Sequence, residues 1–159
     1  GGKNMAPRQH MRKMKVGKVT FTEAYKAVNE YRRKFPEKAV TFYAQNYPAM
    51  GWAVFMAGGS CPVIPCKDKA FLKDAAVMEV EETDSEDYKK MVKSGIGSII
   101  YSNSGVEVPV QLSSGKYILR YIHPDSGEME VISKSLKINN VYTLKVPDGK
   151  EGVYWFHRL

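Results

Sequence analysis

Three histidines, His10, His123 and His157, carry the side chain most often used for acid–base and metal chemistry. Zinc ligands recur at short spacings, whereas these three residues lie far apart in the sequence. His10 falls in a basic N-terminal stretch, and the other two are expected on separate strands. The sequence therefore predicts no metal ligand and no general base among them.

Paired carboxylates are the next candidates, because glycoside hydrolysis needs two acids about 5–10 Å apart in a cleft. The acidic residues gather between residues 79 and 87, and residues 40–60 contain none. Helix capping and solvation account for that acidic cluster. No catalytic residue and no cofactor is assigned from the sequence.

Gly58-Gly59-Ser60 has the composition of a phosphate-binding loop or a nucleophile elbow. Both of those motifs join a strand to a helix, whereas this stretch follows a predicted helix. It also lacks the lysine of a nucleotide-binding loop. We therefore expect it to end the helix.

Aromatic rings can stack on the apolar faces of sugars, and the chain holds ten tyrosines and two tryptophans. Aromatic residues in strands are mostly core or cross-strand partners, so a structural role competes with binding at each position. Trp52 and Tyr121 are retained as candidate ligand-binding residues.

Cys61 and Cys66 are separated by four residues, two of which are prolines. This spacing fits neither a redox pair with a two-residue spacer nor half of a zinc site. The sequence leaves two alternatives open: a disulfide in an exported protein, or two buried free thiols.

The N-terminal part predicts a helix, a strand and a helix. A capping box at Thr20 and Glu23 begins the first helix, and Pro36 ends it. Residues 39–44 are β-prone and apolar on both faces, as in a buried strand of a parallel sheet. Residues 49–57 predict a second helix that is apolar nearly all round.

From residue 71 onward the pattern changes to strands. Residues 77–81 alternate like a half-buried strand, and Thr83 or Asp84 is expected to cap a short helix that ends at Gly95. Turns containing Gly, Asn or Asp then separate six further strands, which indicates an antiparallel sandwich. These strands are predicted at residues 97–102, 106–112, 116–123, 129–138, 141–146 and 153–157.

The formal net charge of +7 is concentrated at one end of the chain. Residues 1–38 carry eleven basic and three acidic residues, and the remainder carries thirteen and fourteen. Nucleic-acid grooves interleave basic residues with aromatics, and residues 1–18 contain no aromatic residue. We expect a solvated or partner-docking arm rather than a nucleic-acid site. No apolar stretch of about 18 residues is present to span a membrane.

Residues 115–128 contain a strand ending at Tyr121 and the turn His123-Pro124-Asp125-Ser126-Gly127. This stretch resembles the C-terminal β-domain of bacterial glycoside-hydrolase-like proteins, including the apiosidase-like group. The family's turn is Asp-Pro-Arg-Thr-Gly, so His123 and Asp125-Ser126 depart from it. The collagen-binding label sometimes given to that domain is not carried over to this chain.

Residues 35–40 and 51–60 resemble the last helix–strand–helix of a (β/α)8 barrel from the same kind of protein, just before the β-domain. Residues at the C-terminal end of a barrel strand face the active site. The resemblance therefore implies Tyr43, Gln45 and Asn46 as candidate ligand-binding residues. It places the catalytic acids upstream of this chain and implies a secreted or periplasmic location.

The sequence thus predicts an α+β chain with a short N-terminal α-β-α unit packed against a C-terminal antiparallel β-sandwich. Its expected parts are a basic flexible arm (1–18), the α-β-α unit (19–70) and the sandwich (71–159). The expected function is a non-catalytic, glycan-associated accessory module with a polysaccharide ligand. Two alternatives stay open: a glycoside hydrolase fragment active only on assembly, and a basic-arm binder of nucleic acid or acidic surfaces.

A lone strand at residues 39–44 cannot pair both of its edges or bury both of its faces. Together with the apolar helix at 49–57, it is expected to leave hydrophobic surface uncovered. The sequence therefore predicts self-association, or docking to a missing barrel.

Overall fold

The computed structural model describes residues 20–40, 48–60 and 62–159, in which helices precede strands along the chain. The helices are α1 (Phe21–Lys34), α2 (Pro48–Met56) and α3 (Lys69–Val77). The strands are β1 (Glu79–Glu81), β2 (Tyr88–Lys93), β3 (Gly97–Ser102), β4 (Glu107–Gln111), β5 (Gly115–Ile122), β6 (Met129–Ile138), β7 (Val141–Lys145) and β8 (Gly152–Arg158).

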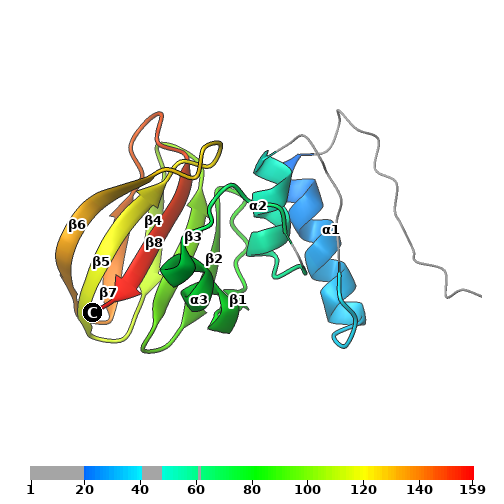
Figure 1. Ribbon diagram of the computed structural model, residues 1–159, viewed down its shortest axis with the longest axis horizontal. Helices are drawn as coiled ribbons and strands as arrows, with labels where there is room; N and C mark the ends of the chain where they lie inside the picture. Colours follow the sequence, from blue (N-terminus) through cyan, green and yellow to red (C-terminus); the bar gives the residue numbers. More distant parts are fainter. Residues whose placement is uncertain (1–19, 41–47, 61) are drawn as a thin grey trace, which may run out of the picture.

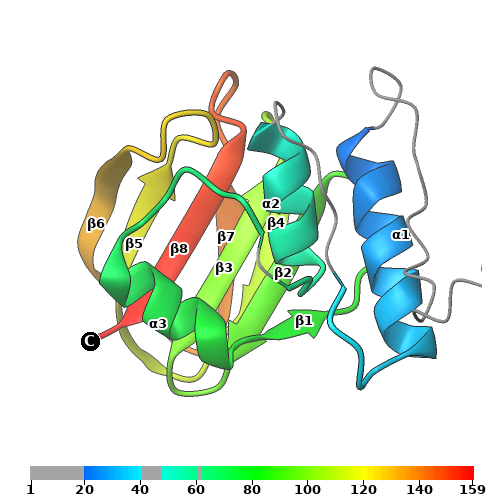
Figure 2. The same ribbon diagram turned by 45° about the vertical axis from the view of Figure 1, so that its right-hand side comes forward.

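Six strands form one antiparallel sheet in the order β1-β2-β3-β8-β5-β6, and β4 pairs with β7 in a second, two-stranded sheet. The helices cover one face of the large sheet, and β4 and β7 cover the other (Figures 1 and 2). The predicted α+β fold with a β-sandwich core is confirmed.

Two hydrophobic cores lie on the two faces of the large sheet. Because successive side chains of a strand point to opposite faces, β8 contributes to both cores. Val153 and Trp155 pack with the helices, and Tyr154 and Phe156 pack against β4 and β7. The six strands predicted from residue 97 onward are confirmed, with ends that agree within one residue.

Helix α1 begins as the sequence predicts. The Thr20 backbone N–H donates to Glu23 Oε2 at 3.0 Å, and the Glu23 backbone N–H donates to Thr20 Oγ1 at 3.2 Å. The helix ends at Lys34, before Pro36. Its buried side chains, Ala24, Tyr25 and Val28, lie in its N-terminal half.

Helix α2 lies between α1 and the large sheet (Figure 1). Residues 50–57 are all buried, so the apolar surface of this helix is covered by other parts of the same chain. The expectation that this helix exposes hydrophobic surface is therefore wrong. Self-association stays a prediction without that support.

The strand predicted at residues 39–44 falls mostly outside the described residues. Positions 39 and 40 are not in a strand, and the Val40 carbonyl accepts a hydrogen bond from the Ser60 backbone N–H at 2.7 Å. Positions 41–44 are not described.

Helix α3 was not predicted from the sequence. Asp68 is its N-cap, and Asp68 Oδ1 accepts a hydrogen bond from the Phe71 backbone N–H at 2.9 Å. Val77, predicted as the start of a strand, is the last residue of this helix, and β1 begins at Glu79. Asp68 was the available signal, because aspartate is a preferred N-cap residue.

The short helix predicted between Thr83 and Gly95 is also wrong. Thr83 Oγ1 accepts a hydrogen bond from the Ser85 backbone N–H, and Ser85 Oγ accepts one from that of Asp87. The hydroxyl side chains thus close local turns instead of capping a helix, a competition that Ser and Thr commonly produce. The lysine-rich stretch that follows is β2, and Gly95 lies in its turn to β3.

Two lysines of β2 are buried and paired with oxygen atoms. Lys89 Nζ donates to the Ser85 carbonyl at 2.9 Å and lies 4.8 Å from the centre of the Tyr25 ring. Lys90 Nζ donates to the Pro109 carbonyl at 2.9 Å and lies 3.3 Å from a Glu81 carboxylate oxygen. Burial lowers the pKa of Lys89, and the nearby charge of Lys26 adds to that shift.

The turn after β5 docks against the helical side of the chain. The Trp52 indole N–H donates to the Pro124 carbonyl at 2.8 Å. Gly127 has a φ of 77°, and a Cβ there would lie 2.6 Å from the Pro65 carbonyl oxygen. The turn that carries the family resemblance is therefore held against α2 and the loop before α3.

Substituting Gly127→Ala is expected to lower the free energy of unfolding by roughly 2–4 kcal/mol, because strain at positive φ adds to displacement of the Pro65 loop. Gly149→Ala is the matched control, since Gly149 has a φ of 75° and no atom within 4 Å of its would-be Cβ. The control should lose only about 1 kcal/mol. Urea unfolding of both variants measures the difference. Equal losses would show that the Pro65 contact is unimportant.

Candidate functional site

Of the five predicted ligand-binding residues, the structure describes Trp52 and Tyr121. Tyr43, Gln45 and Asn46 lie outside the described residues. Trp52 and Tyr121 are 0% and 4% exposed, and they pack in different cores on opposite faces of the large sheet. Ligand binding by these residues stays a prediction, and the burial of the two rings favours a structural role.

A polar cluster lies directly above Tyr121, at the end of the sandwich where β5, β6 and the β7–β8 loop meet. We name it the Glu130 cluster, and it consists of His123, Glu130 and Lys150. Glu130 Oε2 is 2.9 Å from His123 Nε2 and 3.3 Å from Lys150 Nζ. All three side chains are between one-third and about half exposed, so their polar groups are accessible to solvent.

Tyr121 supports the Glu130 cluster from below. The His123 ring meets the Tyr121 ring edge-on at 4.7 Å between centroids, and Lys150 Nζ lies 5.3 Å from the Tyr121 ring centre. The Tyr121 hydroxyl donates to the Glu151 carbonyl at 2.6 Å, which fixes the ring. The cluster therefore packs on a buried, hydrogen-bonded aromatic ring.

The electrostatics of the cluster are set by the two hydrogen-bonding partners of Glu130. The hydrogen bond from Lys150 is the largest effect and holds the pKa of Glu130 below its usual value, and the hydrogen bond from His123 acts in the same direction. Burial raises the pKa of Tyr121, with a smaller contribution from Glu130. At neutral pH the cluster therefore presents an ionised carboxylate beside an ammonium group.

A second polar group joins α3 to β8. Asp74 Oδ2 accepts a hydrogen bond from the Trp155 indole N–H at 2.9 Å and lies 2.7 Å from His157 Nδ1. Asp74 is 6% exposed, whereas the His157 side chain is 34% exposed. The carboxylate orients the partly exposed imidazole through Nδ1. Sequence reasoning missed this pair, because Asp74 and His157 are 83 positions apart and Asp74 falls in the missed helix.

His157 also contacts the Trp155 ring, at 5.4 Å between the ring centroids. The residues that the structure describes contain no group of three or more His, Cys, Asp or Glu side chains that could hold a metal ion. The Arg120 guanidinium stacks 4.8 Å from the centre of the Trp155 ring. The Asp74–His157 pair ties α3 to the last strand, β8.

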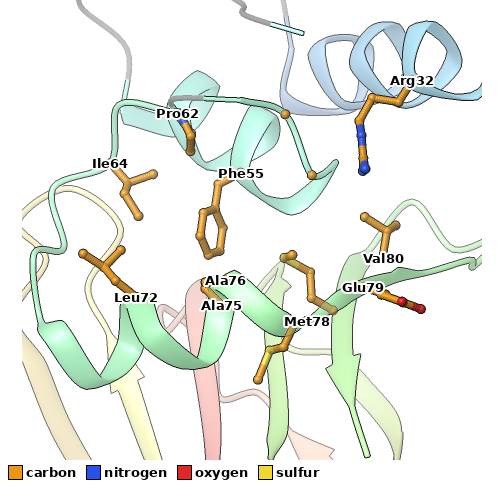
Figure 3. Close-up of a pocket in the computed structure, with 13 residues that line it drawn as sticks. Arg32, Phe55, Pro62, Ile64, Leu72, Ala75, Ala76, Met78, Glu79 and Val80 are labelled. Atoms are coloured by element: carbon orange, nitrogen blue, oxygen red, sulfur yellow. The ribbon is translucent and has the colours of Figure 1, made fainter. Parts of the chain in front are cut away.

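A surface cavity of about 480 Å³ lies between the helices and β1 (Figure 3). Arg32 of α1 and Phe55 of α2 line it from one side, and Leu72 and Met78 line it from the other. Figure 3 shows the Arg32 side chain directed from α1 toward the cavity. The cavity combines apolar walls with a cation at one end.

Cys66 is buried with a free thiol, and burial raises its pKa. Cys61 is not among the described residues. A buried thiol with a raised pKa is mostly protonated at neutral pH and is a weak nucleophile. Cys66 therefore behaves as part of the core.

A family model described as "Domain of unknown function (DUF6298)" matches residues 1–78. That match is to a family without an assigned function. It covers α1 to α3 and ends one residue before β1. A search of curated proteins gave no match. The resemblance to glycoside-hydrolase-like proteins and the boundary at residue 71 stay predictions.

None of the helices in the described parts of the chain combines the length and the apolar character needed to cross a bilayer.

The pKa of Glu130 gives a direct test of the Glu130 cluster. Lys150→Met should raise that pKa toward the value of an isolated glutamate, because it removes the largest stabilising partner of the carboxylate. His123→Gln should raise it by less. NMR detection of the side-chain carboxyl carbon during a pH titration measures both shifts. A larger effect of His123→Gln, or no effect of either substitution, would contradict the described geometry.

Proposed function

We propose that this protein is a non-catalytic, glycan-binding accessory module whose sugar-binding surface is the Glu130 cluster. The proposal follows the resemblance of residues 115–128 to the β-domain of glycoside-hydrolase-like proteins. An exported location belongs to the same proposal. The observation that carries it is a fixed, solvent-accessible set of hydrogen-bonding groups at one end of a β-sandwich.

The chemistry of the cluster suits sugar hydroxyl groups. An ionised carboxylate only accepts hydrogen bonds and has about four lone-pair sites, so Glu130 retains sites beyond its two present partners. Lys150 carries three N–H donors, of which Glu130 engages one. Neighbouring hydroxyls of a sugar ring can donate to the carboxylate and accept from the ammonium group.

The position of the cluster limits the entropy lost on binding. His123 lies in the turn that Trp52 and Pro65 hold in place, and Lys150 lies beside the fixed ring of Tyr121. Groups that are already positioned lose less conformational entropy when a ligand binds. This arrangement favours a role in glycan binding over the role of a solvated ion-pair cluster that binds no ligand.

The two alternatives from the sequence depend on residues that are not described. A glycoside hydrolase fragment would use the segment around Gln45 and Asn46, and a binder of nucleic acid or acidic surfaces would use residues 1–18. Neither gains support from the geometry of the described residues.

The proposal predicts binding of at least one polysaccharide from a broad glycan array, followed by calorimetric titration with the responding oligosaccharide. Glu130→Gln should weaken that binding about tenfold or more, because charge-assisted hydrogen bonds contribute roughly 1.5–3 kcal/mol. Glu86→Gln is the matched control. Glu86 is an exposed glutamate on the β1–β2 loop, and it forms an ion pair with Lys26 of α1.

Each outcome of the array experiment has a clear meaning. Binding that Glu130→Gln leaves unchanged would place the sugar site elsewhere and refute the assignment to the cluster. A complete lack of glycan binding would refute the proposed function. Turnover of chromogenic glycosides by the same protein would favour the hydrolase alternative.

A further inference from the structure

The cavity between the helices and β1 is not part of the proposed glycan site. Its volume of about 480 Å³ falls within the range of small-molecule sites. It lies among residues of the helix-side core and its rim, whereas Tyr121, beneath the Glu130 cluster, belongs to the opposite core. The two surfaces are therefore separate.

The walls of the cavity are apolar. Phe55, Met78 and Met91 are buried core residues that line it, and Ile64 and Leu72 also line it. Apart from Arg32 and Glu79, the residues that line the cavity are apolar or are glycines. Such a surface favours an aliphatic or aromatic group over a sugar.

Arg32 supplies a positive charge at one end of this cavity. Its Nη1 donates to the Ala57 carbonyl at 3.2 Å, which fixes the guanidinium with most of its N–H donors unused by that bond. Among the described residues, no carboxylate lies within ion-pair distance of Arg32, whereas the adjacent Arg33 pairs with Glu82. A guanidinium presents a planar fork that matches a carboxylate.

Gly58 makes the space that the guanidinium occupies. A Cβ at Gly58 would lie 2.1 Å from Arg32 Nη1 and 3.3 Å from a methyl group of Val80. Any larger residue would force the Arg32 guanidinium to move. The glycine that ends α2 thus also admits the charged group.

Glu79 is the other ionisable residue that lines the cavity, and it lies at the rim on β1. In Figure 3 its carboxylate extends away from the apolar part of the cavity. One anionic group on a ligand can therefore meet Arg32, but a second would meet repulsion from Glu79. This selects for a ligand with a single negative charge.

We propose that this cavity binds an amphipathic monocarboxylate, with the carboxylate on Arg32 and the apolar chain against Phe55, Leu72 and Met78. The carboxylate accepts hydrogen bonds from the guanidinium, and the chain displaces water from the apolar walls. The charge on Glu79 weakens the complex.

Calorimetric titration of the full chain with decanoate, below its micelle concentration, tests the proposal, with 1-decanol as the neutral probe. Decanoate should bind one to one and more tightly than decanol. Arg32→Gln should weaken decanoate binding about tenfold or more and leave decanol binding nearly unchanged. Glu79→Gln should strengthen decanoate binding by about 2- to 5-fold, because a like charge is removed.

Two further variants separate binding from folding. Arg33→Gln removes a neighbouring guanidinium that faces Glu82 instead of the cavity, and it should leave decanoate affinity unchanged. Ala76→Trp fills the cavity from an exposed position of α3 and should abolish binding of both probes. Circular dichroism melting curves check that each variant folds.

Absence of decanoate binding would overturn the proposal, as would equal affinity for decanoate and decanol. Equal losses for both probes in Arg32→Gln would show that Arg32 only supports the cavity wall through Ala57. Because the Glu130 cluster is elsewhere, none of these results depends on whether the protein binds glycans.

Discussion

The fold depends on the burial of β8 on both of its faces. Residues 152–156 are all buried, and alternate side chains enter the two cores. A strand of this kind leaves neither face to solvent, so the sheet requires a cover on each side. The helices provide one cover and the β4–β7 pair provides the other, and neither cover can be removed without exposing large aromatic side chains such as Trp155 and Phe156.

This two-sided burial also explains how the helical part is fixed to the sheet. Asp74 of α3 binds the Trp155 and His157 side chains of β8, and Trp52 of α2 binds the carbonyl of Pro124 after β5. Each bond satisfies an indole N–H that burial would otherwise leave unpaired, at a cost of about 1–3 kcal/mol. The two tryptophans therefore specify where the helices dock as well as filling the core.

The sequence predicts the strands from residue 97 onward because alternation and turn residues are local signals. It fails where the outcome depends on distant partners. Lys89 and Lys90 look like the end of an exposed helix, but the Tyr25 ring and the Pro109 carbonyl accommodate them in a strand. The Asp74–His157 pair and the Glu130 cluster each join segments that are separate in sequence. Burial of Trp52 and Tyr121 in different cores likewise has no local signature.

The exposed apolar residues of the sandwich include Val131 and Ile132 on the edge strand β6, which are 51% and 53% exposed, and Val141 at the start of β7, which is 66% exposed. An open edge of ten residues invites pairing with another chain. The β5–β6 register shifts twice, between Tyr117 and Leu119 and between Leu119 and Arg120. Such irregularities bend the strand and interrupt the row of free backbone groups, and Lys134 and Lys137 add charge to it. Helix α2 is buried inside the chain, so it offers no apolar surface for association. Association through β6 would have to overcome the bends and charges of that strand. The structure therefore gives edge pairing little support.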